Sequence, residues 1–491
     1  MLLTVLISRV SHTVQSTIRI LTKRICKQRG RRDQDEDENE KDHDRDNNGD
    51  DDDDHNNAAT DSMASSSLRD HDSSVGPMCH QEDESLPIFR LVDLPTDLTR
   101  LIGEFLLYKE VVRLSRTSHR MKTQLHNVAI WECMPMRQWM EYSPAVIANL
   151  RSVLVSESDD LTRLPRLLKH LVFHYGFNQL IEPSELPLTL TRLEFGTSFN
   201  QPIEKLKLPS SLKELRFGYY SRFNQPIEQL KQPPSLADLE FDFDSAFDQP
   251  IEQLQLPPSL THLEFGCEFN QPIEMLQLPP SLTSLHLGGM FNRPIEQLKL
   301  PSSLTYLYFP RFSAFNHPVE QLQLPLLLTH LEFGCDFNQP IEQLQLPPSL
   351  RSLKFGRKFN QPIEMLQLPP SLTSLTLGQE FNQPIEQWKL PPSLTYLLFN
   401  YLSEFNHPIE QLQLPPSLTH LALGSSFNRP VEQFQLPISL RRLEFGLSFN
   451  QPIEKLQLPP SLRSLKFGQS FNQPIEKLQL PPSLTNLSFP F

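Results

Sequence analysis

The stretch 269–288 reads FNQPIEMLQLPPSLTSLHLG, and close copies of it fill the chain from Phe177 to Phe491. Each copy opens with a phenylalanine, and consecutive phenylalanines of this kind are 22 or 24 residues apart. The fourteen of them are Phe177, Phe199, Phe223, Phe247, Phe269, Phe291, Phe315, Phe337, Phe359, Phe381, Phe405, Phe427, Phe449 and Phe471. Such regular self-similarity identifies a repeat protein, and the unusual content of 45 Pro and 16 Gly in 491 residues agrees with it.

Each unit predicts one short strand and one tight turn. Leu285 and Leu287 alternate with polar residues, which predicts a strand with one face in a core and the other in solvent. Ile273 and Leu276 lie three residues apart behind a proline, which predicts a single helical or 3₁₀ turn. Seven apolar positions in 22 cannot be buried within one unit, so the coils have to stack. The expected fold class is an α/β solenoid, a right-handed, rod-like stack of 22–24-residue coils with a parallel β-sheet on one face.

The repeated motifs resemble a known family. The L-x-x-L-x-L spacing is that of leucine-rich repeats, and the Phe-Asn-x-Pro-Ile signature resembles the FNIP repeat, which is found in amoebae and in giant viruses that infect them and often follows an F-box. The resemblance implies fourteen FNIP-type units over 177–491, and degenerate copies over 141–176 are expected to cap the array. Gln232 at a core leucine position and Asp248 at an asparagine position predict a looser third and fourth unit.

The region 86–140 is predicted to form a small all-α module. Leu98, Ile102 and Leu106 have the spacing of one helix face. The order of a Leu-Pro pair, an acidic residue, a helix and a later Val/Leu stretch resembles the F-box, and this implies docking on a Skp-type linker protein of a cullin-RING ubiquitin ligase. The residues that carry the resemblance and would contact the linker are Leu94, Pro95, Asp97, Leu98, Ile102, Leu106, Val112 and Leu114. The alternative is that these helices only cap the apolar end of the array.

The N-terminal segments differ in charge. Residues 1–32 carry eight Lys or Arg and no acid, with apolar residues three or four apart, which predicts a basic amphipathic leader. A membrane contact through 1–27 or a targeting role is the alternative to a dispensable leader. Residues 33–84 are rich in Asp, Asn and Ser and are expected to form an acidic disordered linker. The total net charge is -13, and because 33–54 carry -12 and 1–32 carry +8, the residues from His55 onward carry -9, which lacks the basic balance of a nucleic-acid binder.

Cysteines and motifs limit the possible chemistry. The five cysteines form no CxxC pair, which argues against a disulfide framework or a zinc site and favours a reducing compartment, the cytoplasm or a host cytosol. His262, His330 and His420 share one strand position but lie several coils apart, too far to share a metal ion. Since catalytic and nucleotide-binding motifs are also absent from the sequence, we expect no enzyme activity, no cofactor and no metal site.

Two side-chain columns remain to be interpreted. The asparagine that follows each opening phenylalanine is expected to form an amide ladder that satisfies backbone groups. The exposed strand positions, in contrast, change in sign and size from coil to coil, as a recognition surface requires, although drift of unconstrained surface residues is the alternative. The candidate target-binding residues are Tyr306, Tyr308, Tyr396, Leu398, Arg192, Arg216, His262, His330, His420 and Arg442.

These observations favour three functional hypotheses. The leading one is the substrate-recognition subunit of a cullin-RING ubiquitin ligase, whose repeats bind an unknown protein target. The alternative is a non-enzymatic protein-protein interaction scaffold without any link to ubiquitin. A membrane-surface organiser that acts through residues 1–27 is the third.

Overall fold

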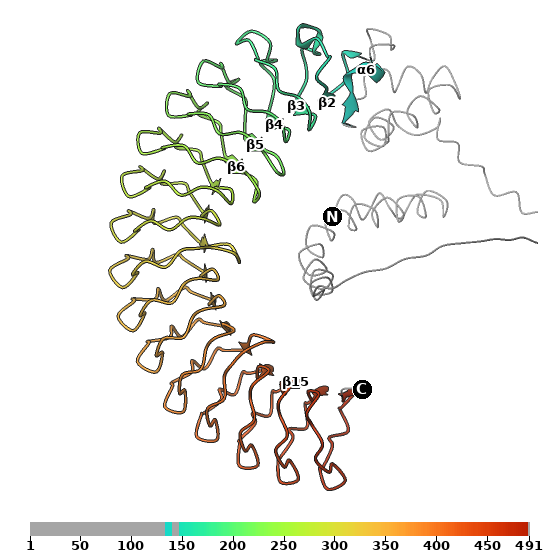
Figure 1. Cartoon of the computed structure of the whole chain (residues 1–491), viewed down its shortest axis with the longest axis vertical. Coiled ribbons are helices and arrows are strands. Elements are labelled where there is room, and N and C mark those ends of the chain that lie inside the picture. The colour runs from blue at the N-terminus through green and yellow to red at the C-terminus, as the bar shows by residue number, and fades with distance from the viewer. Residues whose placement is uncertain (1–132, 140–146, 490–491) are drawn as a thin grey trace, which may run out of the picture. The chain divides into compact units, whose positions relative to one another are not determined.

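A computed structural model describes residues 133–139 and 147–489, which all belong to one compact unit of the chain, Thr96–Phe491. The predicted leader, the acidic linker and nearly all of the F-box-like module, including its linker-binding residues, lie outside the described residues. The described coils follow one another along an arc, and a single sheet runs through all of them (Figure 1).

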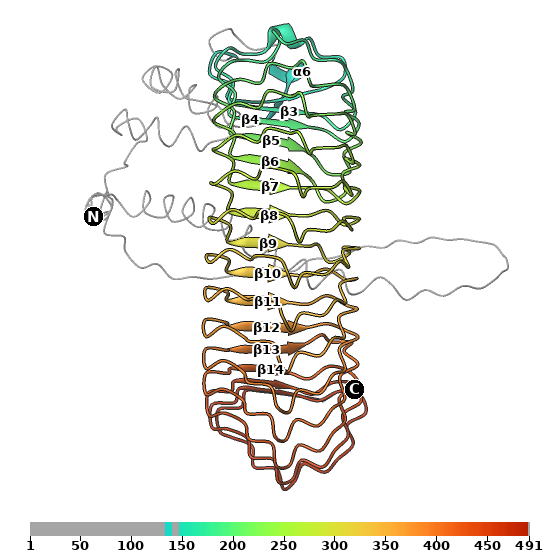
Figure 2. The same cartoon turned by 90° about the vertical axis from the view of Figure 1, so that its left-hand side faces the viewer.

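Each coil contributes one strand, which forms where a buried leucine stands between two polar residues. Consecutive strands pair in parallel and in register, so that Leu331 lies beside Leu307 on one side and Leu353 on the other. Figure 2 shows the strands lying one above the next in sequence order. The 17-stranded sheet consists of β1 (Met134–Pro135), β2 (Ser152–Val155), β3 (His170–Phe173), β4 (Arg192–Phe195), β5 (Glu214–Phe217), β6 (Asp238–Phe241), β7 (His262–Glu264), β8 (Ser284–His286), β9 (Tyr306–Tyr308), β10 (His330–Glu332), β11 (Ser352–Lys354), β12 (Ser374–Leu377), β13 (Tyr396–Phe399), β14 (His420–Ala422), β15 (Arg442–Glu444), β16 (Ser464–Lys466) and β17 (Asn486–Ser488).

The sheet begins before the first FN unit. β2 pairs with both β1 and β3, and β3 pairs with β4, so the coils that precede Phe177 share the sheet of the array. β1 itself lies within the region 86–140, for which the sequence predicts helices. Within the described residues, the sheet of the solenoid therefore starts at Met134.

The interior is filled by the residues that the repeat keeps constant. In the unit that opens at Phe337, the side chains of Phe337, Ile341, Leu350 and Leu353 are at most 1% exposed. The ring of Phe337 stacks on that of Phe333 with centroids 4.0 Å apart. The aromatic residues thus point inward, which confirms the predicted core.

The stack curves, and the widths of its layers explain why. Neighbouring strands of a sheet are about 4.8 Å apart. The rings of Phe333 and Phe355, just after the strands, are 5.7 Å apart, and those of Phe337 and Phe359, further along each coil, are 6.1 Å apart. Successive coils are therefore farther apart at the aromatic rings than at the strands. Because of this difference in spacing, the stack bends toward the sheet, which lines the inner side of the arc (Figure 1). The predicted stack of coils is therefore present, and it is curved.

The structure confirms the predicted single turn of each unit but not the α/β class. In the turn after each opening phenylalanine, a single hydrogen bond forms, as from Leu344 N–H to the Ile341 carbonyl at 3.0 Å, and the chain then extends. Pro340 and Pro347 leave only six residues between them, too few to nucleate a helix. Within 133–139 and 147–489, helical residues are limited to the short α6 (Met136–Trp139), Ile147 and the 3₁₀ turn η2 (Leu161–Arg163). The solenoid is therefore a β-solenoid.

No helix in the described part of the chain has the length and apolar run that crossing a bilayer requires.

Side-chain ladders satisfy backbone groups that the turns leave unpaired. Asn338 N–H donates to Asn316 Oδ1 at 2.8 Å, and Asn338 Oδ1 in turn accepts from Asn360 N–H at 2.9 Å. The same pattern continues from Asn178 to Asn472, which confirms the predicted amide ladder. A second ladder follows the Pro-Pro pair, where Ser349 Oγ donates to the Leu328 carbonyl of the preceding coil at 2.7 Å.

The four 24-residue units place their two extra residues in the loop after the strand. Each of these loops carries a serine that is at most 1% exposed, at positions Ser221, Ser245, Ser313 and Ser403. The hydroxyl of Ser313 accepts the N–H of Phe315 at 3.2 Å. In a 22-residue unit, the carbonyl of Gly288 accepts the N–H of Phe291 instead, at 3.2 Å. The serine therefore replaces a backbone acceptor that the longer loop moves away.

Candidate functional site

The first and third residues of strands β4 to β17 point away from the packed interior and form the surface that we call the concave face (Figure 1). On most strands the burial alternates, with the middle leucine buried and its two neighbours half-buried or exposed. All ten predicted target-binding residues lie on this face: Arg192, Arg216, His262, Tyr306, Tyr308, His330, Tyr396, Leu398, His420 and Arg442. The sheet distributes them over three clusters and does not bring them into one site.

The first cluster is a chain of ion pairs on β4 to β6. Arg192 contacts Glu194 at 2.7 Å and Glu214 at 3.6 Å, and Arg216 contacts Glu214 at 3.5 Å and Glu240 at 3.0 Å. Each arginine therefore stands between two carboxylates of neighbouring columns. Burial raises the pKa of the Glu240 carboxyl even though Arg216 opposes the shift. The two arginines are thus held by carboxylates of the same face, and with Asp238 the face of β4 to β6 keeps an excess of negative charge.

The second cluster combines two histidines with a carboxylate. Glu264 Oε2 lies 3.4 Å from His262 Nε2 and 3.4 Å from His286 Nδ1. Burial acts to raise the pKa of Glu264, but hydrogen bonds from the two histidines outweigh it and lower the pKa to about 2. Burial likewise acts to lower the pKa of His262, but the hydrogen bond to Glu264 and the carboxylates of Glu240 and Asp238 raise it above its usual value.

Sequence reasoning singled out His262 and missed its two partners. The histidines were compared along one column, and the structure indeed separates His262, His330 and His420 onto β7, β10 and β14. The partners Glu264 and His286 belong to the other column, one of them on the next strand. The signal that could have found them is a His-x-Glu strand followed by a strand with histidine at its third position.

Aromatic side chains continue the same cluster over β8 to β10. The ring of Tyr308 lies 5.1 Å from His286 and 6.0 Å from Tyr306, and Tyr306 lies 5.4 Å from His330. Burial and the nearby Glu332 carboxylate raise the pKa of the Tyr308 phenol, so this tyrosine stays protonated. Rigid, half-buried aromatics of this kind are favoured anchors for a protein partner.

The third cluster lies on β13 to β15. Tyr396, which is 41% exposed, stacks on His420 with ring centroids 4.5 Å apart, and Leu398 stands in the adjacent column. Arg442 pairs with Glu444 on its own strand. The predicted residues Tyr396, Leu398 and His420 are thus brought together as one apolar and aromatic patch, and Arg442 borders it.

Exposed aromatic residues also occur outside the concave face, where the sequence did not suggest them. The two-residue insertions after the strands carry large apolar side chains that are more than half exposed: Tyr219, Tyr220, Phe312, Tyr401 and Leu402. Their signal in the sequence is an aromatic residue or leucine within each of these insertions. These exposed side chains lie on separate loops beside the concave face.

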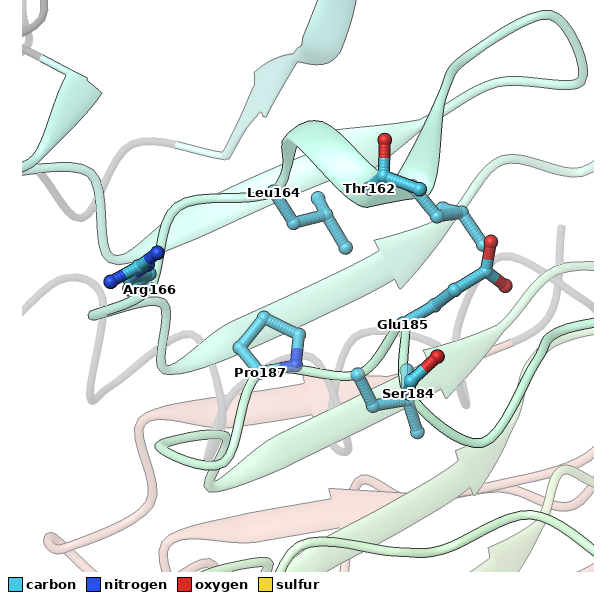
Figure 3. Close-up of a pocket in the computed structure, with 8 residues that line it drawn as sticks. Thr162, Leu164, Arg166, Ser184, Glu185 and Pro187 are labelled. Atoms are coloured by element: carbon cyan, nitrogen blue, oxygen red, sulfur yellow. The ribbon is translucent and has the colours of Figure 1, made fainter.

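A pocket of about 250 Å³ lies near the start of the array (Figure 3). Leu164 and Pro187 lie on opposite walls of it, and Arg166 and Glu185 stand at opposite ends. Because its charged groups do not converge on one point, the pocket does not have the features of a small-molecule site. It also lies apart from the predicted target-binding residues, which begin at Arg192 on β4.

The chain is similar in part to several proteins of known structure. CroV588, whose crystal structure is described as that of a novel circular LRR protein, is 37% identical over 69% of this chain, with a TM-score of 0.43. This chain spans 62% of the length of CroV588. The LRR protein LIC12759 of Leptospira interrogans is 21% identical over 72% of this chain and 99% of its own, with a TM-score of 0.44.

An internalin of Listeria monocytogenes is 16% identical over 60% of this chain and 85% of its own, with a TM-score of 0.42. The curated proteins give no significant match. The FNIP Repeat family model matches at residues 162–198, 177–220, 223–268, 269–312, 315–358, 359–402, 405–448 and 449–491. These matches cover well over half of the chain, and they coincide with coils whose phenylalanines, asparagines and prolines each have a structural role, so the protein belongs to the FNIP repeat family.

Proposed function

We propose that the concave face binds a protein and that the F-box-like region 86–140 couples the bound protein to a cullin-RING ubiquitin ligase through a Skp-type linker. The chain then acts in the cytosol as a substrate receptor and has no catalytic activity of its own. It works by effective concentration, because one curved scaffold holds target and ligase together.

The contrast between interior and face carries this proposal. Interior positions repeat nearly the same residue in every coil and are buried, whereas the concave columns differ from strand to strand over the same sheet. The buried framework is thus nearly the same in every coil, whereas the exposed side chains differ from coil to coil. Other repeat proteins that bind through a curved sheet or surface have the same contrast. The columns of β4 to β17 contain seven acidic residues and five Lys or Arg, a balance that favours a protein over a nucleic acid.

The ligase part of the proposal rests on the residues of the F-box resemblance, and a purified Skp-type linker tests it. The full-length protein should retain the linker, and a variant with Leu94→Ala, Pro95→Ala and Leu98→Ala should lose it. Absence of binding by the folded wild-type chain would leave the alternative, a protein-interaction scaffold without a ubiquitin link.

The recognition part is tested by comparing two surface variants of the full-length chain. Tyr306→Ala with Tyr396→Ala removes one anchor from each aromatic cluster of the concave face. Met275→Ala with Met365→Ala removes apolar side chains that are more exposed than the two tyrosines and lie in the tight turns, outside the strand face. A protein that is captured through the face should bind the tyrosine variant about 10-fold or more weakly and the methionine variant unchanged. Equal binding by all three forms would place recognition elsewhere.

A further inference from the structure

We propose that His262, Glu264 and His286 form a binding site for a divalent transition-metal ion of the zinc type. One donor atom of each residue lies within 4.8 Å of the other two. The sheet enforces this placement, because His262 and Glu264 are two residues apart on one face of β7 and Glu264 is the register partner of His286 on β8. The site is therefore built on strands and does not depend on a loop.

The distances suit a shared ion. Glu264 Oε2 is 3.4 Å from His262 Nε2 and 3.4 Å from His286 Nδ1, so both contacts are long for N–H···O hydrogen bonds. The edge of a tetrahedral shell with metal-ligand bonds of about 2.0–2.1 Å is about 3.3–3.4 Å long. Two of the three edges thus already have the length that an ion requires, and the two histidine nitrogens, which lie within 4.8 Å of each other, form the third edge.

The ligand set and its surroundings suit zinc. Two imidazoles and one carboxylate are the ligands of zinc sites that keep one position open, whereas magnesium and calcium prefer oxygen ligands alone. Ser284 Oγ lies 3.1 Å from His286 Nε2 and can accept its N–H, which leaves Nδ1 available to the ion. The three side chains are 22–27% exposed, so an ion would be partly shielded from water yet accessible.

The site lies where a bound molecule can reach it. Asp238 and Glu240 on the neighbouring strand β6 are the register partners of His262 and Glu264 and add negative charge beside the ion. The open coordination position lies on the concave face, where a water molecule or a side chain of a bound protein would complete the shell. This last role rests on the proposed function, whereas metal binding does not.

The chain contains a near-copy of the site that lacks one ligand. Residues 329–335 repeat the THLEFGC of 261–267, and the following strands read SLH at 284–286 and SLK at 352–354. Lys354 therefore stands where the third ligand would be, and its ammonium group lies 2.8 Å from Glu332. The lysine supplies the cation that a metal would otherwise provide, so this copy is a matched control.

The test titrates full-length protein, stripped of metal by a chelator, with Zn²⁺ or Mg²⁺ at about pH 7.5, because protons compete with a metal ion for histidine ligands at lower pH. Bound metal is counted after equilibrium dialysis, and thermal unfolding of each variant verifies that it is folded. We expect one tight Zn²⁺ per chain and no tight Mg²⁺. His286→Ala and the isosteric Glu264→Gln should each weaken Zn²⁺ binding at least about 10-fold, whereas His330→Ala should leave it unchanged.

A gain-of-function variant provides an independent test. Lys354→His completes the ligand set on β10 and β11, with Ser352 in the place of Ser284, and should raise the count from one tight Zn²⁺ to two. The chain has 15 histidines, so the difference between variants, and not the total metal bound, is diagnostic. Equal losses in His286→Ala and His330→Ala, or a count that Lys354→His leaves unchanged, would overturn the proposal.

Discussion

Gln232 occupies a position where neighbouring coils place Leu208 and Leu256 against the core. Both polar atoms of its side chain are buried and lack a hydrogen-bond partner. A buried amide of this kind costs about 1–3 kcal/mol, so Gln232→Leu should stabilise the protein by about that amount. Chemical denaturation followed by circular dichroism measures the change, and Leu256→Gln should shift the midpoint in the opposite direction. Lower stability of Gln232→Leu would show that the amide has a partner in solution.

Glu264 allows a test by pH in a solution that contains a chelator. Its pKa is lowered from 4.5 to about 2, so its stabilisation is present above about pH 4.5 and is lost as the pH falls toward 2. His262, which also faces Asp238 and Glu240, has a raised pKa, so its stabilisation is present below pH 6.5 and is lost as the pH rises through the folded value. The two windows overlap between about pH 4.5 and 6.5.

Glu264→Gln should therefore lower the free energy of unfolding most near pH 5.5, by about 1–3 kcal/mol, and clearly less near pH 8.5. Denaturation curves at both pH values measure this difference. Glu332→Gln is the matched control, because Glu332 pairs with Lys354 and lysine stays protonated across the whole range. If Glu264→Gln lowered the free energy of unfolding equally at both pH values, the histidines would not be the partners of Glu264.

The amide ladder is the element that can be tested most directly. Asn338 Oδ1 accepts from Asn360 N–H and from Gln361 Nε2, both at 2.9 Å. Asn338→Ala removes this acceptor and should destabilise the protein by about 1–2 kcal/mol. Asn338→Asp should cost much less, because Asp248 already fills the equivalent position and accepts from Asn270 N–H at 2.8 Å. Equal effects of the two substitutions on the denaturation midpoint would argue against the ladder.

The sequence predicted those elements whose cause lies within a single unit. The alternation around Leu285 predicted the strand, and the regular asparagines predicted the ladder, because both depend on residues that recur in every coil. The single turn at Ile273 and Leu276 was also predicted correctly, but the α/β assignment failed because the flanking prolines keep that turn from extending into a helix. The buried Ser313 and its equivalents compensate for the longer loops, which the pattern of insertions alone did not reveal.

At the scale of the whole molecule, the sequence predicts fewer features of the structure. Curvature depends on the difference between the strand spacing and the 6.1 Å spacing of rings such as Phe337 and Phe359, which no residue pattern states. The His262, Glu264 and His286 group depends on which strands are neighbours and on which columns meet across them. Both features depend on contacts between neighbouring coils, so the sequence of a single unit does not predict them.

Removal of one whole coil tests the continuity of the stack. Deletion of 337–358 takes out one 22-residue unit with β11 and joins Asp336 to Phe359, where the chain resumes at the same point of the repeat. Because each coil contacts mainly its neighbours, the shortened protein should remain folded, with a smaller radius of gyration in small-angle scattering and an unfolding midpoint within a few degrees of the original. Deletion of only 337–347 brings the tight turn of one coil against the strand of another and should abolish cooperative unfolding. If the two deletions were equally damaging, the coils would not be interchangeable units of one solenoid.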